Sequence, residues 1–382
     1  MSKNSNCTQC KKARSLLLYI AGDNDLSEAG LRDISELCEE GSSPSVHVGV
    51  EIDTRGEHSG SIRYEITEPD FEGNAHRTVI ERLSEFDSGK PRTLMSFINW
   101  GMKRYPAKEV ALVIGGHGDG FRNRRRSIAL DEGGSSLDMP EIEYVFKRCK
   151  IGRKNKLGIL GFDACLMGML EIAFHFSDYT RILVVSQEVE PGDGWPYNKV
   201  LQHLKNSQSI ENVAKGIIDS YIRHYIKIAV TNVTQSAIDL KKTRHAMKAL
   251  SSLGYGLVDY LENSNNNLKH LKRLQTLRQN TQGFSVAEYV DAIHFAEQLK
   301  MLQETLITKL AERLITTLKE CILSYWNLGR EVKNANGLSI WFPAAIFSHA
   351  VNRSRYLNLN GAKEFDGWIK FLDTYFGMQR IA

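Results

Sequence analysis

A chain of 382 residues with a formal net charge of +4 lacks the strongly basic balance that is typical of nucleic-acid-binding proteins. Its hydrophobic fraction of 42% and charged fraction of 25% are those of an ordinary folded protein of one or two domains. No apolar run approaches the roughly 18 residues that a membrane-spanning helix requires. We therefore expect no nucleic-acid partner and no membrane span.

The first 14 residues form a polar tail in which Cys7 and Cys10 make a single CxxC motif. A zinc site needs about four ligands, and no second pair lies at a suitable spacing, so no metal site is predicted there. The other cysteines are scattered, which favours a reducing compartment over a disulfide scaffold. The apolar run at 16–21 is shorter than the roughly 7–15 residues of a secretory signal, so the chain as written predicts a cytoplasmic location.

The first 240 residues alternate between apolar runs and helical patterns. The runs are nearly continuous in Leu, Ile and Val, which is typical of parallel strands covered on both faces. Predicted strands are 16–21, 46–53, 110–115, 157–162 and 182–186, with an inserted strand or hairpin arm at 59–67. Predicted helices are 28–39, 93–105, 140–150 and 167–176. This alternation predicts an α/β fold with a doubly wound, mostly parallel sheet.

From about Lys241 onward, helical periods dominate the sequence. Predicted helices are 243–262, 286–298, 302–323 and 368–376, with a strand-like run at 337–343. We therefore divide the chain into an N-terminal tail (1–14), an α/β catalytic domain (15–240) and a mainly helical C-terminal subdomain packed on it (241–382).

Two of the predicted strands are followed by reactive side chains. The run ALVIGGHGDGF places His117 just past the strand 110–115, and LGILGFDACLMG places Cys165 just past the strand 157–162. Ligands bind beyond the carboxyl ends of parallel strands, so we expect both residues at one opening. A helix predicted to begin near Leu166 would favour a thiolate at Cys165, with His117 as its proton partner. The N–H groups of Gly118 and Cys165 would then hold an oxyanion.

The residues alone leave simpler interpretations open. A cysteine after a buried strand is more often an inert core thiol than a nucleophile. A histidine in a glycine-rich loop is more often a turn residue or a metal ligand than a catalytic base. The pairing of both residue types at equivalent strand ends is what favours a catalytic site.

Three longer motifs, GGHGDGF, FDACLMG and SQEVEPGDGWPY, occur in that order and together resemble the clostripain family of cysteine peptidases, relatives of gingipains, legumains, caspases and separases. The early YIAGDNDL and the late GLSIWFP are similar to the same family, so the resemblance covers nearly the whole chain. It implies a caspase-like three-layer sandwich and a dyad of Cys165 and His117 without an obligatory third member. It also implies cleavage of substrates after Arg or Lys. It further implies maturation of the enzyme by a cut between the histidine motif GGHGDGF and the cysteine motif FDACLMG.

The charges around the nucleophile predict the same preference. Asp163 lies two residues before Cys165, and Asp193 lies in a loop that should border the same cleft. Two carboxylates at the base of a pocket bind a guanidinium or ammonium group by charge-assisted hydrogen bonds. Trp195 would wall this pocket or simply pack in the core. The alternative is that Asp163 caps the following helix and Asp193 makes a turn.

The basic run FRNRRR lies between His117 and Cys165 in the sequence. We expect self-cleavage after Arg124, Arg125 or Arg126, unless the run is simply a solvated surface loop. No cofactor is required by this interpretation. Some members of the resembled family respond to calcium, and the DNDL turn leaves a calcium role open, although no EF-hand spacing is present.

The sequence therefore predicts a monomeric endopeptidase that acts on peptides or proteins with Arg or Lys at the cleaved position. One alternative is a catalytically silent module that binds basic peptides in the same cleft. Another is a caspase-like peptidase with a different specificity, such as Asp or Asn. An Asp-selective pocket would need an Arg at its base, and neither FDACLMG nor PGDGW supplies one. Relatives in the resembled family are often secreted.

Overall fold

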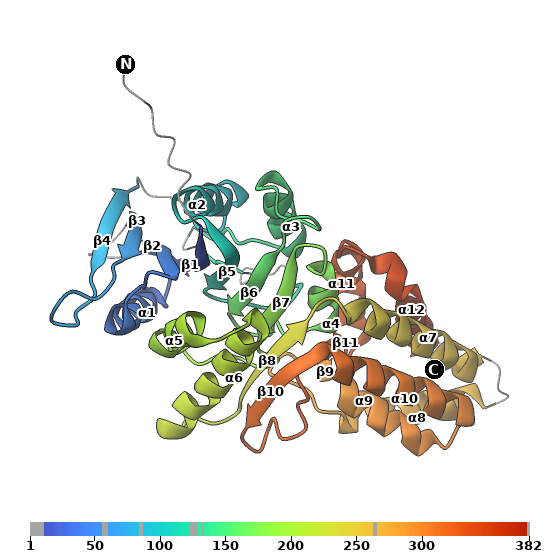
Figure 1. The fold of residues 1–382 in the computed structure, drawn as a ribbon. Coiled ribbons are helices and arrows are strands. Elements are labelled where there is room, and N and C mark those ends of the chain that lie inside the picture. The colour runs from blue at the N-terminus through green and yellow to red at the C-terminus, as the bar shows by residue number, and fades with distance from the viewer. Residues whose placement is uncertain are drawn as a thin grey trace.

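The computed structural model describes residues 11–55, 60–83, 87–122, 128–131, 133–262 and 266–379. These residues contain a nine-stranded sheet with the order β10-β8-β7-β6-β5-β1-β2-β3-β4 (Figure 1). Its five central strands are parallel: β2 (Val46–Thr54), β1 (Lys12–Gly22), β5 (Ala107–Gly115), β6 (Leu157–Asp163) and β7 (Thr180–Val185). The antiparallel outer strands are β3 (Gly60–Ile66), β4 (Arg77–Arg82), β8 (Val233–Asp239) and β10 (Ile322–Leu328). The predicted mostly parallel α/β sheet is confirmed.

The register of the central strands explains why their sequences are apolar without a break. Leu17, Leu112, Leu160 and Leu183 are aligned in one row across β1, β5, β6 and β7, and all four lie in one apolar cluster. The neighbouring positions point to the opposite face and into a second cluster. Each fully buried side chain of this size contributes about 1.5–3 kcal/mol, so both faces stabilise the sheet.

Helices cover both faces of the sheet and complete three layers (Figure 1). One face packs against α2 (Pro91–Arg104), α3 (Met139–Arg148) and α4 (Leu170–His175). The other face packs against α1 (Ser27–Glu40), α5 (Tyr197–Asn206) and α6 (Ile210–Lys227). The structure thus has the expected sandwich architecture.

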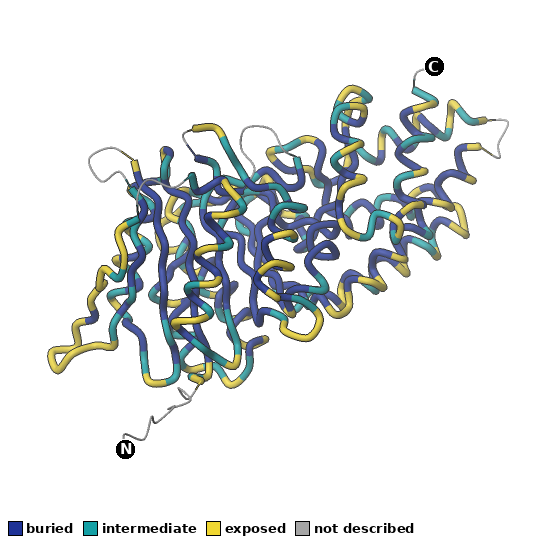
Figure 2. Tube along the Cα trace, turned by 90° about the horizontal axis from the view of Figure 1, so that it is seen from above, coloured by how far each residue is buried: buried dark blue, intermediate teal, exposed yellow. Residues whose placement is uncertain are grey.

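The chain after β8 is mainly helical and extends the first apolar cluster. Buried residues are dark blue in Figure 2. Its helices are α7 (Thr243–Glu262), α8 (Asn267–Asn280), α9 (Ala292–Leu299), η2 (Lys300–Leu302), α10 (Thr305–Cys321), α11 (Ile346–Leu357), η3 (Ala362–Phe365) and α12 (Asp366–Gln379). A small antiparallel pair joins β9 (Tyr289–Asp291) to β11 (Ser339–Trp341). No helix among the described residues combines the length and the apolarity needed to cross a bilayer.

Three predicted helices differ from the structure at their ends. The helix predicted at 302–323 ends at Cys321, because the chain continues as β10 and pairs with β8. The helix predicted at 286–298 begins only at Ala292, where the Asp291 carboxylate caps it by accepting a hydrogen bond from His294 N–H. The helix predicted at 167–176 begins at Leu170. The segment after Lys241 therefore supplies a strand to the main sheet as well as packing on it.

Candidate active site

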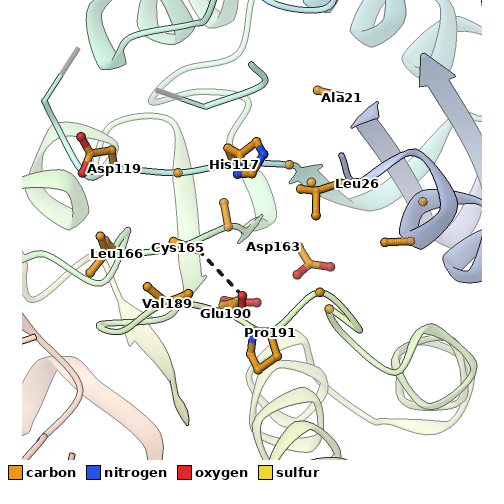
Figure 3. A pocket seen from close by; sticks show the side chains of 18 of the residues that line it. Ala21, Leu26, His117, Asp119, Asp163, Cys165, Leu166, Val189, Glu190 and Pro191 are labelled. Carbon is orange, nitrogen blue, oxygen red and sulfur yellow. Dashed lines mark hydrogen bonds between the residues drawn. The ribbon is translucent and has the colours of Figure 1, made fainter. Parts of the chain in front are cut away.

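His117 and Cys165 follow β5 and β6, which are adjacent parallel strands paired at Gly115 and Asp163. Both residues line a cavity of about 560 Å³ at the carboxyl end of the sheet (Figure 3). Its other walls come from the start of α1, from the loop that contains Glu190, and from Ser285 and Val286. The structure thus brings the two predicted catalytic residues to one opening.

Gly118 allows the two loops to touch. A Cβ atom at this position would lie 2.4 Å from the carbonyl oxygen of Cys165 and 3.0 Å from its amide nitrogen. Real side-chain atoms do not approach backbone so closely, so only glycine fits without displacing a loop. The backbone after His117 therefore packs directly on the backbone of Cys165.

Cys165 is partly exposed, and its Sγ lies 3.9 Å from the carbonyl oxygen of Glu190. Leu166 has a left-handed φ of +65°, and its N–H bonds the carbonyl of Glu188. The expectation that Cys165 begins a helix is therefore wrong, because α4 starts five residues later, at Leu170. Burial raises the pKa of the Cys165 thiol, and the negative charge of Asp163 adds to this. The resting residue is accordingly a thiol rather than a dipole-stabilised thiolate.

The raised pKa predicts how the reactivity of the Cys165 thiol depends on pH. A thiol with a raised pKa is mostly protonated at neutral pH, and only the thiolate reacts with alkylating reagents. We expect the rate of alkylation by iodoacetamide at Cys165 to rise about tenfold per pH unit from pH 7 and to be still rising at pH 9. Mass spectrometry of the peptide that contains Cys165 measures this rate. A plateau below pH 7 would show an activated thiolate instead.

The His117 ring has a partner that the sequence did not suggest. Its Nε2 lies 2.7 Å from Oδ1 of Asp25, in the loop between β1 and α1. This hydrogen bond to His117 is the main cause that lowers the pKa of Asp25. The two predicted catalytic side chains thus face one cavity, while the hydrogen bonds of this state run from Cys165 to Glu190 and between His117 and Asp25.

Two neighbouring carboxyl groups, those of Asp163 and Glu190, line the cavity. The Asp163 carboxylate accepts hydrogen bonds from Trp195 N–H (3.2 Å) and from the Tyr197 hydroxyl (2.9 Å), and it contacts the Glu190 carboxyl group. Glu190 also accepts from the Trp195 indole and from Gln235. Burial raises the pKa of both carboxyls, and Asp163 raises that of Glu190 further. We expect such a pair to share one proton and to keep one negative charge near neutral pH.

Asp33 adds a third carboxyl group to the cavity wall. Burial raises its pKa well above the usual value, and the nearby charges of Asp163 and Glu36 add to this. Sequence reasoning missed both Asp33 and Glu190. The available signals were that Asp33 lies one turn after Gly30 on the inward side of α1, and that Glu190 belongs to the motif SQEVEPGDGWPY.

Asp193 and Trp195 are not brought into the cavity wall. Asp193 is half exposed at the rim, 3.8 Å from both Arg32 and His224, although Gly192 and Gly194 beside it line the cavity. Trp195 is fully buried against Gly161, where a Cβ atom would lie 2.7 Å from the indole. The alternative expectation for Trp195, that it packs in the core, fits its position.

The candidate cleavage residues Arg124, Arg125 and Arg126 lie outside the described residues, as do Cys7 and Cys10. Arg122, just before them, donates to Asp119 at 2.6 Å and to Glu288 at 2.9 Å. These contacts fasten the loop after His117 to the chain that follows β8.

Residues 18–374 match the sequence model of the clostripain family. Clostripain from Hathewaya histolytica is 24% identical over 283 residues, which cover 65% of this chain and 53% of clostripain, so the match spans about half of that protein.

Solved structures share the fold at low identity. One is a secreted cysteine protease from Bacteroides thetaiotaomicron in complex with an irreversible peptide inhibitor. It superposes with a TM-score of 0.71 at 17% sequence identity, and the match covers 93% of this chain and 99% of that protease chain. Another is an inactive zymogen protease from Parabacteroides distasonis, with a TM-score of 0.70 at 18% identity, covering 93% and 98% of the two chains.

Proposed function

This chain belongs to the clostripain family of cysteine peptidases, and from that premise we propose that it hydrolyses peptide bonds after basic residues, with Arg preferred and Lys accepted. Cys165 is the nucleophile and His117 is its proton partner. One observation carries the proposal: the two side chains line a single cavity that Asp163, Glu190 and Asp33 also line.

The proposed reaction passes through a thioester. Cys165 Sγ forms a bond to the scissile carbonyl carbon while His117 takes the thiol proton. The C–N bond then breaks, and His117 delivers that proton to the leaving amine. Water attacks the thioester, His117 accepts its proton, and the thiol is restored as the acid product leaves. Because the Cys165 pKa is raised, a base must remove the proton during the attack.

The oxyanion of the tetrahedral intermediate would be held by the N–H groups of Gly118 and Cys165. Support comes from the close approach of the Gly118 backbone to the backbone of Cys165. Fixed N–H donors at this point stabilise the charge that develops on the carbonyl oxygen.

A guanidinium or ammonium group would bind well beside the carboxyl groups of Asp163, Glu190 and Asp33. Its positive charge favours the ionised form of these groups and compensates their negative charge. Among the described lining residues the only Arg or Lys is Arg122, which is bonded to Asp119 and Glu288. A pocket selective for Asp is therefore less well supported. Asp193 at the rim would add attraction for a basic side chain without touching it.

We also propose a monomer that cuts itself after Arg126 or a neighbouring arginine. Both His117 and Cys165 are supplied by the same chain, so the proposed dyad needs no second copy. The described segment before the basic run ends at Arg122, which donates a hydrogen bond to Glu288. The segment after it resumes at Ile128, which forms a β-bridge with Leu137. The chain is therefore anchored on both sides of the basic run.

A panel of fluorogenic peptides that end in Arg, Lys, Asn or Asp tests the proposed specificity. We expect kcat/KM to be about 100-fold higher for Arg than for Asn, since a charge-assisted hydrogen bond is lost with the neutral residue. Turnover of none by folded protein would favour the silent binding module. A preference for Asp or Asn would contradict the acidic pocket and leave the dyad standing.

A further inference from the structure

A groove with a volume of about 570 Å³ lies beside α8, in the helical chain that follows β8. Its lining residues come from α8 and from η2, and none of them is among the described residues that line the active-site cavity. Leu277 and Leu302 are buried in its wall, whereas Leu268 and Met301 are 59% and 64% exposed. We call this surface the α8 groove.

The apolar part of the α8 groove has the character of a binding surface. Single exposed apolar side chains are normal on a protein, but Leu268 and Met301 border one hollow that buried leucines also line. A hollow receives side chains that a partner inserts, whereas a lipid bilayer is bound by apolar side chains that protrude into it. The shape therefore favours a protein segment over a membrane.

The charged part of the groove is positive. The sequence of α8, NLKHLKRLQTLRQN, contains four Lys or Arg residues and no Asp or Glu, and three of the four, Lys269, Lys272 and Arg273, line the groove. No salt bridge between described residues involves Lys269 or Lys272. Arg273 donates to the Leu302 carbonyl at 3.0 Å and so ties α8 to η2. Two exposed ammonium groups are thus available to a partner that carries carboxylates.

The position of Lys269 in the helix favours the same partner. Lys269 lies in the first turn of α8, and that turn contains no acidic residue. The amino end of a helix carries a partial positive charge, so a lysine there is unfavourable for folding and a nearby carboxylate is favourable. A bound carboxylate would be stabilised both by the ammonium group and by the end of the helix.

We propose that the α8 groove binds an acidic amphipathic helix of another protein. Leu268, Lys272 and Thr276 are spaced by four residues and form one row along α8, which a second helix laid beside it can follow. Apolar side chains of the partner would enter the groove, and its Asp or Glu side chains would pair with Lys269 and Lys272. This surface does not rest on the proposed peptidase activity.

A second copy of this chain is a poorer occupant. Its acidic helix, α1, has the sequence SEAGLRDISELCEE, but the apolar residues Ile34 and Leu37 of that helix are fully buried in the core. They could enter a groove on another copy only if α1 left the sheet. The partner is therefore expected to be a different protein.

The test measures binding of a fluorescein-labelled synthetic helix to Cys165→Ala protein, which cannot cut the probe by the proposed route. The probe has about five turns, with Leu on one face and Glu on the other. A matched probe carries Gln in place of every Glu. We expect the Glu probe to bind about tenfold more tightly than the Gln probe at low salt. Added salt should reduce this difference, because it screens exposed charges. Fluorescence anisotropy measures both affinities.

Substitutions in the groove locate the binding. Lys269→Glu together with Lys272→Glu should weaken binding of the Glu probe by about tenfold or more, because both charges are reversed. Met301→Gln should weaken it roughly fivefold by removing an apolar contact. Lys215→Glu together with Lys227→Glu is the matched control, since it reverses two exposed lysines on α6 and should leave the affinity within about twofold.

The charge-reversed variant should fold, because a glutamate in the first turn of α8 is favourable, and an unchanged Tm checks this. Equal binding of the two probes overturns the proposal, and so does binding that survives the reversal of Lys269 and Lys272. Phosphatidylglycerol vesicles that bind the parent protein but not this variant would overturn it in favour of a membrane. A dimer in sedimentation that this variant dissociates would overturn it in favour of a second copy. Because the readout is binding by inactive protein, a failed peptidase assay has no bearing on it.

Discussion

Replacing Cys165 with Ala is expected to reduce kcat/KM for Arg peptides by about 10⁴-fold or more, because the covalent route through the thioester is lost. His117→Ala should cost about 10²–10⁴-fold, the usual contribution of a positioned acid and base. Both side chains are at the cavity wall rather than in the core, so the fold should survive. Steady-state kinetics with circular dichroism measures both effects.

Cys38→Ala provides the matched control, since Cys38 is also a half-buried free thiol but lies on the outer part of α1, away from the lining residues. It should keep activity within about threefold. Equal losses for Cys38 and Cys165 would contradict the assignment of the nucleophile.

The same protein preparations test whether the enzyme cleaves itself. Wild-type protein should separate into two fragments on a denaturing gel, and the Cys165→Ala protein should stay intact. Wild-type protein that stays intact and fully active would remove the cleavage proposal and leave the peptidase proposal untouched.

Asp163→Asn is expected to lower kcat/KM for Arg peptides by about 100-fold, chiefly through KM. The amide oxygen can still accept from Trp195 N–H and Tyr197 OH, so the pocket should keep its shape while it loses its charge. Asp193→Asn should cost only about threefold, because an exposed charge at the rim is screened by solvent and salt. Equal losses for the two variants would show that Asp193 moves into the pocket when substrate binds.

A second readout separates a specificity role of Asp163 from a structural one. Burial is the main cause of the raised Cys165 pKa, but the charge of Asp163 adds to it. Removing that charge should therefore speed alkylation of Cys165 by the neutral reagent iodoacetamide at fixed pH, while turnover of Arg peptides falls. A damaged site would also expose the thiol and speed its alkylation, so the comparison requires that the variant keep the circular dichroism spectrum and Tm of the parent protein.

Local sequence was enough to predict the sheet and the placement of His117 and Cys165 at one cavity. Strands such as β1 and β6 are covered on both faces, so their apolar runs are continuous and visible without a structure. Parallel strands end at one edge of the sheet, and that single geometric rule placed His117 and Cys165 together. The motifs around these residues also indicated the family.

Contacts between distant segments were decided only by the tertiary structure. Asp33 and Asp163 line one cavity because α1 begins at the edge of the sheet where β6 ends. Carboxylates that are tens of residues apart leave no periodic trace in the sequence. Their shared charge appears only once strand order and helix packing fix the distances between them.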